Sequence, residues 1–92
     1  MDELEFLELL NEDLISEFTA ISHYVCYAAC IKGINRPELK EMFEEESASE
    51  LEHAQFFADK IVALGGTPDI NVQPPMPAAD TTEMLNNLLT LE

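Results

Sequence analysis

The chain has 92 residues, enough for one small domain, and 47% of them are apolar, so a hydrophobic core can form. It carries 19 acidic side chains against four basic ones, a formal net charge of −15. This charge argues against nucleic acid and anionic membranes as partners, because both need basic patches. It would attract cations, although solubility alone is the simplest explanation of the charge.

Residues 1–32 are expected to form the first helix. Apolar side chains recur there at alternating steps of three and four residues, and neither Pro nor Gly interrupts them. The members of this stripe are Leu7, Leu10, Leu14, Ile21, Tyr24, Ala28 and Ile31. Glu17 stands in the same stripe, where Leu or Ile would be expected. Gly33 ends the pattern and begins a short turn.

Residues 37–64 are expected to form the second helix, antiparallel to the first because the connection is short. Pro37 suits a first helical turn, and Gly65 and Gly66 supply the stop. Its stripe comprises Leu39, Phe43, Glu46, Glu50, His53, Phe57 and Leu64, with Ile61 at the edge. The phenylalanines are expected in the core.

Four of the five prolines fall in residues 67–80, which we name the crossing segment and expect to be extended. Residues 81–92 then predict a short third helix, capped by Asp80 or Thr81. Two cysteines, Cys26 and Cys30, form neither a zinc signature nor a disulfide framework and are expected to serve helix packing. His23 lies off the first stripe and is expected to be exposed.

The chain begins without the basic start and apolar core of a signal peptide, and no apolar run is long enough to span a bilayer. We therefore expect a cytoplasmic protein without a membrane partner.

Three residues, Glu17, Glu50 and His53, carry the chemistry. Burying an unpaired carboxylate costs about several kcal/mol, so another group must compensate its charge. The lysines and the arginine lie off both stripes or at their ends, which leaves a metal cation. Carboxylate and imidazole together suit iron, manganese or zinc. Glu17 lies 14 residues before Ile31 and Glu50 lies 13 after Pro37, so an antiparallel hairpin brings them to one depth.

Glu-x-x-His by itself is a weak motif, and its simplest explanation is a solvated acidic face. The matched depth of Glu17 favours metal binding over that explanation. Glu46 is expected near the ligands or at the entrance of the site. Tyr24 is expected to pack in the core, with a hydrogen bond that could reach a ligand carboxylate.

The sequence resembles the ferritin-like superfamily, especially its bacterioferritin branch. "LNEDLISEFTAISHY" is similar to the first helix of that family, with Glu17 as a ligand, and "EEESASELEHAQFFADKIVALGGTPD" to the second, with Glu50 bridging and His53 terminal. "DTTEMLNNLLTLE" is similar to the start of the third helix and would make Glu92 an auxiliary ligand. The resemblance implies an all-α fold, spanning 1–92 as a half or truncated ferritin-like domain.

The resemblance also implies a di-iron centre that oxidises Fe(II) with oxygen or peroxide, in iron storage or detoxification. The family's fourth helix has no counterpart here. Leu51 replaces the methionine that binds haem in bacterioferritins, so no haem is expected. Peroxide or oxygenase chemistry at the same ligands, and a non-catalytic helical interaction module or fragment, are the alternatives.

The working unit is expected to be at least a homodimer with the metal site at the interface. A lone hairpin would leave one side of its stripe open, and the side chains expected there are Leu10, Leu14, Ile21, Phe43 and Phe57. Three ligands are too few for two metal ions, so a second copy would complete both a four-helix bundle and the ligand set.

Overall fold

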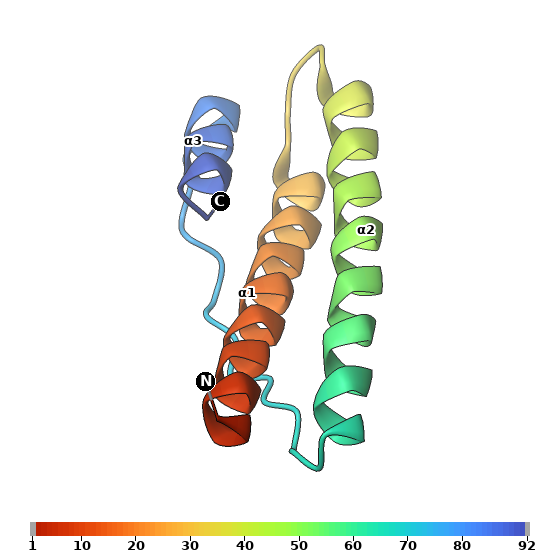
Figure 1. The fold of residues 1–92 in the computed structure, drawn as a ribbon. Helices are drawn as coiled ribbons and strands as arrows, with labels where there is room; N and C mark the ends of the chain where they lie inside the picture. Colours follow the sequence, from red (N-terminus) through yellow and green to blue (C-terminus); the bar gives the residue numbers. More distant parts are fainter. Residues whose placement is uncertain (1, 92) are drawn as a thin grey trace.

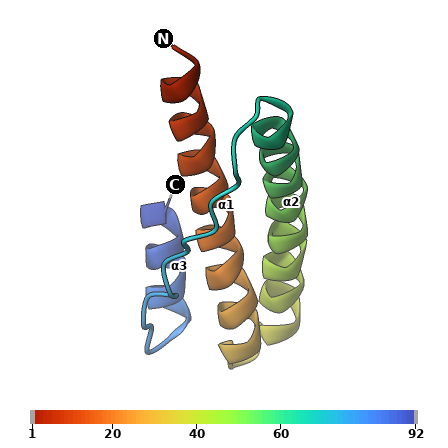
Figure 2. The ribbon, with the colours of Figure 1, turned by 90° about the horizontal axis from the view of Figure 1, so that it is seen from below.

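The structure, a computed structural model, describes residues 2–91. It contains three helices, α1 (Glu3–Cys30), α2 (Arg36–Ala63) and α3 (Thr81–Leu91), and these residues include no strand. The two long helices form an antiparallel hairpin, and α3 lies on the other side of α1 from α2 (Figures 1 and 2). The molecule is elongated, 50 × 19 × 17 Å, and the expected all-α fold is confirmed.

Local chemistry explains where the helices begin and end. The Asp2 carboxylate accepts the N–H of Glu5 at 2.8 Å and caps α1, which ends at Cys30, two residues before the expected boundary. Gly33, at φ 104°, makes the turn into α2 in a conformation that other residues rarely adopt. At the start of α3, Asp80 accepts the N–H of Glu83 at 2.9 Å, while the Glu83 carboxylate accepts the N–H of Ala79 at 2.7 Å. This pair resembles a capping box, except that the Glu83 carboxylate binds the N–H of the residue before the cap.

The core consists of two clusters along the hairpin. One joins α1 to α2 near the N-terminal end of α1 and contains Leu10, Leu14, Ala54 and Ile61. The other includes α3 and contains Tyr24, Tyr27, Ala28, Ile31, Phe43, Met84 and Leu88. Along the chain, Glu17 falls between the two clusters on α1 and Glu50 falls between them on α2. The candidate ligands therefore interrupt the apolar interface at its middle.

Burial corrects the expectation of an open stripe. Leu14 and Phe43 are fully buried and Leu10 is 7% exposed, because the two helices and α3 cover them. Ile61, expected at the edge of the α2 stripe, has no exposed surface. The exposed apolar side chains are others, and the largest fractions among them belong to Ile34, Leu4, Leu89, Ile70 and Phe56.

Two further expectations about packing are wrong. Cys26 and Cys30 are exposed free thiols, because their side of α1 faces away from both core clusters. Phe56 is 64% exposed, so not every phenylalanine belongs to the core. None of the described helices is both long and apolar enough to cross a membrane.

The crossing segment passes over α1 on its way from α2 to α3, as Figure 2 shows. It has no regular secondary structure before the bend at its end, so side chains of α1 hold it. Asn11 binds its start, through the carbonyl of Thr67 at 3.3 Å and the N–H of Asp69 at 2.8 Å. Near its end lies His23, which is 1% exposed. The expectation that His23 is exposed is wrong because the crossing segment covers it.

Candidate metal centre

Glu17 projects from the middle of α1 toward α2. Its side chain retains 19% of its exposed surface, and one carboxylate oxygen, Oε2, is buried without a hydrogen-bond partner. Helix α1 places the carboxylate there because Glu17 lies three residues after Leu14, on the face that packs against α2. A buried oxygen of this kind needs a cation or a donor to offset its lost hydration.

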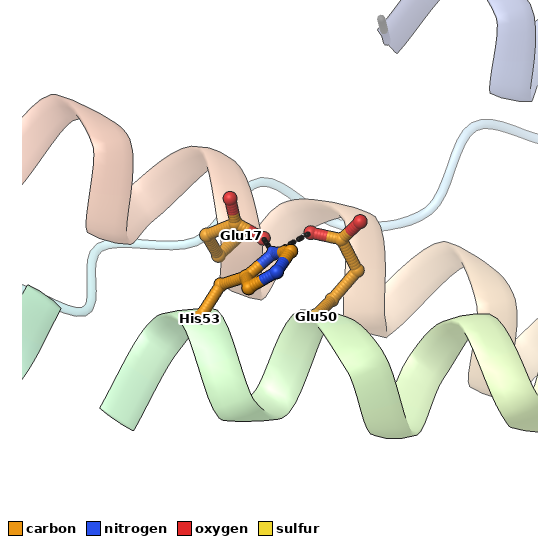
Figure 3. Close-up of side chains that lie close together, drawn as sticks. All are labelled: Glu17, Glu50 and His53. Carbon is orange, nitrogen blue, oxygen red and sulfur yellow. Dashed lines mark ion pairs between the residues drawn. The ribbon is translucent and has the colours of Figure 1, made fainter. Parts of the chain in front are cut away.

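Helix α2 supplies the two facing side chains, Glu50 and His53, one turn apart. Figure 3 shows both of them pointing toward Glu17 across the interface. The His53 Nδ1 atom lies 3.6 Å from Glu17 Oε2 and 3.8 Å from Glu50 Oε2. Both distances are too long for hydrogen bonds, so the three groups converge without bonding directly. His53 is 56% exposed, which leaves the centre open to solvent on that side.

The spacing of the three ligand atoms fits a shared cation. One such atom from each residue lies within 4.8 Å of the other two. Ligands bound at about 2.1 Å to one ion lie roughly 3 to 4 Å from each other, which matches the two measured distances. The orphaned Glu17 oxygen has no other described partner, and an ion there would satisfy it. A protonated His53, paired with both carboxylates, is the simplest alternative to a metal.

A cavity of about 270 Å³ adjoins the two carboxylates. Its walls come from all three helices and are formed by Ser16, Glu17, Ala20, Tyr24, Glu50, Leu88 and Leu91. Tyr24 is buried and packs against the Phe43 ring at a centroid distance of 5.9 Å, as expected for a core residue. The cavity places one polar wall, made by the carboxylates, opposite an apolar one from α3.

The structure does not bring every expected residue into the group. Glu46 is exposed and lines a separate groove between α2 and α3, together with Tyr24, Met42, Phe43, Leu85, Leu88 and Leu89. Glu92 lies outside the described residues.

Three residues with a structural part were not predicted from the sequence. They are His23, Tyr27 and Asn87, which hold the crossing segment and α3. Their only sequence signal is the spacing of His23 and Tyr27, one helical turn apart.

The sequence is similar to known ferritin-like proteins. Residues 7–92 match the family model for the ferritin-like domain. A bacterioferritin of Mycolicibacterium paratuberculosis is 40% identical over 65 residues, which are 71% of this chain and 41% of that protein. A bacterial ferritin of Paramagnetospirillum magnetotacticum is 34% identical over 84 residues, 90% of this chain and 51% of that protein. The chain thus spans about half the length, or less, of these relatives.

Solved structures are similar over nearly the whole chain. A ferritin-like, diiron-carboxylate protein from Bacillus anthracis superposes with a TM-score of 0.93 at 41% identity, covering 99% of this chain and 67% of that one. A dodecameric thioferritin, the bacterioferritin-related protein from Bacteroides fragilis, gives a TM-score of 0.87 at 27% identity over 99% of this chain and 60% of that one.

Proposed function

This chain belongs to the ferritin-like family, and we propose that it binds iron through Glu17, Glu50 and His53 as part of a di-iron carboxylate centre. The observation that carries the proposal is the buried, unpartnered oxygen of Glu17, which faces two further metal-binding groups at the middle of an apolar interface. The diiron-carboxylate protein similar to this chain supports iron as the cation.

Each of the three residues has a separate part in holding the ion. Glu17 offers a carboxylate oxygen that is already desolvated, so little hydration is lost when a cation arrives. Glu50 is 23% exposed and comes from the facing helix, where its carboxylate could bridge two ions. His53 offers a neutral nitrogen at the solvent side. Manganese or zinc suits the same donor set, so metal identity needs measurement.

Iron bound there would supply redox chemistry with oxygen or peroxide, and we propose Fe(II) oxidation in iron storage or detoxification as the activity. Helices α1 and α2 hold the Glu17 and Glu50 carboxylates beside His53, and the apolar wall from Leu88 and Leu91 borders the cavity next to them. The centre's open side at His53 provides the path by which Fe(II), attracted by the net charge of −15, would enter.

Three ligand side chains are too few for two ions, so we propose that a second copy supplies the others. Two copies related by a two-fold axis would provide four Glu and two His, the set used by di-iron bundles. The groove beside Glu46, of about 420 Å³, offers apolar surface for such a partner, with Met42 43% and Leu89 68% exposed. The similar thioferritin is dodecameric, which supports self-association of this chain.

The direct test is anaerobic titration with Fe(II), followed by calorimetry, of the wild type and Glu50→Gln. We expect the variant to lose at least tenfold in affinity, because it replaces a charged ligand with a neutral amide of the same shape. Glu45→Gln is the matched control, since Glu45 is an exposed acid on the same helix outside the ligand group. Anomalous scattering at the iron edge would then locate the ion. Equal binding by all three proteins would reject the centre and favour a helical interaction module.

A further inference from the structure

A second polar network lies on the other side of α1, away from the metal centre, around the backbone of Met76. The N–H of Met76 donates to Nε2 of His23 at 3.0 Å, and its carbonyl accepts the hydroxyl of Tyr27 at 2.6 Å. His23 and Tyr27 are one turn apart on α1, with their rings edge to face and 5.6 Å between centroids. Both hydrogen-bonding groups of one residue in the crossing segment are therefore held by α1.

The contacts of His23 indicate which ring nitrogen carries the hydrogen. Nδ1 lies 2.7 Å from the carbonyl oxygen of Thr19, which can only accept, so Nδ1 carries the hydrogen. Nε2 must then be bare, as it accepts the N–H of Met76. His23 is 1% exposed, and both ring nitrogens are occupied within the protein. A buried imidazole with this arrangement serves as a fixed acceptor for the crossing segment.

The network continues from Tyr27 into α3. The side-chain amide of Asn87 donates to the Tyr27 hydroxyl at 3.0 Å and to the carbonyl of Pro77 at 3.3 Å. Apart from these bonds, α3 is held by the packing of two buried side chains, Met84 and Leu88, in the core cluster that contains Tyr27. The prolines of the crossing segment have no N–H with which to bind α1. The position of α3 along α1 thus depends on this small set of hydrogen bonds.

We propose that His23 and Tyr27 are positioning residues, which fix α3 as the apolar wall of the cavity beside Glu17 and Glu50. Leu88 and Leu91 form that wall, and Leu88 lies one residue beyond Asn87, so a shift of α3 moves the wall directly. We call the hydrogen bonds of His23 and Tyr27 to Met76 the clamp. The clamp is argued from these contacts alone, and only its role at a metal centre rests on the proposed function.

The test compares backbone amide exchange in Tyr27→Phe and the wild type, without metal. The variant keeps the ring but loses the bond to Met76 and the acceptor for Asn87. We expect exchange of the amides in residues 85–91 to become roughly fivefold faster, the effect of about one lost hydrogen bond. Asn11→Ala is the matched control. It frees the start of the crossing segment, at Asp69, and should leave the amide exchange rates of α3 within twofold of those in the wild type.

His23 has its own readouts. Imidazole nitrogen shifts should show Nδ1 protonated and Nε2 bare in the wild type. His23→Gln, whose side-chain oxygen can still accept the Met76 N–H, should restore most of the protection that His23→Leu removes. A hydrogen on Nε2, or α3 exchange that is unchanged in Tyr27→Phe, would overturn the proposal. So would an equal effect in Asn11→Ala, which would indicate general loosening.

Removal of Co(II) by a chelator separates this proposal from the metal centre. Co(II) is a redox-stable probe for the same donor set. With α3 displaced, we expect the chelator to remove Co(II) from Tyr27→Phe several-fold faster than from the wild type, while Asn11→Ala matches the wild type. Equal rates in all three would reject the wall role. Failure of the wild type to bind Co(II) or Fe(II) would refute the proposed function, whereas the exchange comparison would still decide the clamp.

Discussion

The Nδ1 atom of His53 lies 3.6 Å from a buried oxygen of Glu17 on the neighbouring helix. This distance is too long for a hydrogen bond, yet it is normal for two ligands of one cation. The Glu17 oxygen accepts no hydrogen bond within the described chain, although its helix could have carried an apolar residue there. Such an arrangement costs stability in the absence of a cation, which makes the metal hypothesis testable by stability as well as by binding.

Replacing Glu17 with Leu should therefore stabilise the metal-free protein. The change removes a largely buried carboxylate, one oxygen of which has no hydrogen bond, and extends the apolar interface, so we expect a gain of about 1 to 2 kcal/mol in unfolding free energy. The same variant should lose the extra stability that Co(II) gives the wild type. Urea unfolding followed by circular dichroism, with and without Co(II), measures both effects.

Glu12→Leu provides the comparison for Glu17→Leu, because Glu12 is an exposed acid on the same helix. It should change the metal-free stability little and keep the full response to Co(II). A Glu17→Leu protein that responds to Co(II) as the wild type does would contradict the assigned ligand role.

Metal affinity should weaken as the solution becomes more acidic. Protons compete with the cation for the carboxylates and for the His53 nitrogen, and His53 with an added proton can pair with both Glu17 and Glu50 instead. Between about pH 7.5 and pH 5, we expect a progressive loss of Co(II) binding, because proton competition for metal ligands grows as the pH falls. Calorimetry at a series of pH values, in buffers of different ionisation enthalpy, would also detect the released proton. Constant affinity over that range would argue against ligation by His53.

Haem should not bind at the position that bacterioferritins use. Leu51 follows Glu50, is 44% exposed and has no atom able to ligate iron. Wild-type protein mixed with haem should therefore show the spectrum of free haem. Only the Leu51→Met variant should show the spectrum of haem iron with a thioether as axial ligand. A shifted Soret band in the wild type that is unaffected by changes at Leu51 would show that haem binds through another residue.

Self-association should depend on the groove between α2 and α3. Met42→Glu places a charge in apolar surface lined also by Phe43 and Leu89, so we expect it to shift the protein toward the monomer. Ile34→Glu adds the same charge at the turn between α1 and α2, where the side chain is 93% exposed, and serves as the control. Sedimentation velocity with and without Fe(II) under anaerobic conditions measures the oligomeric state of both variants.

Because metal at an interface favours assembly by linkage, iron should increase the fraction of the larger species. A wild-type monomer that binds two iron ions would refute the shared centre.

The sequence alone determined the helices and the convergence of the ligands. Heptad spacing without Pro or Gly specifies two long helices, and a short turn forces them to be antiparallel. Nearly equal distances from that turn then bring Glu17 and Glu50 to one depth, and His53 follows because residues three apart share a helix face. These features are local or follow from counting residues, so one chain is enough to derive them.

Only the tertiary structure decided which edges of the helices are covered. Glu46 and His53 belong to the predicted stripe of α2 yet are exposed, whereas Ile61 at its predicted edge is fully buried. His23 was expected in solvent and lies under the crossing segment. The physical reason is that periodicity reports the face that meets a neighbouring helix. It carries no information about where an extended, proline-rich segment will lie, because that segment has no period of its own and its path depends on single side-chain hydrogen bonds.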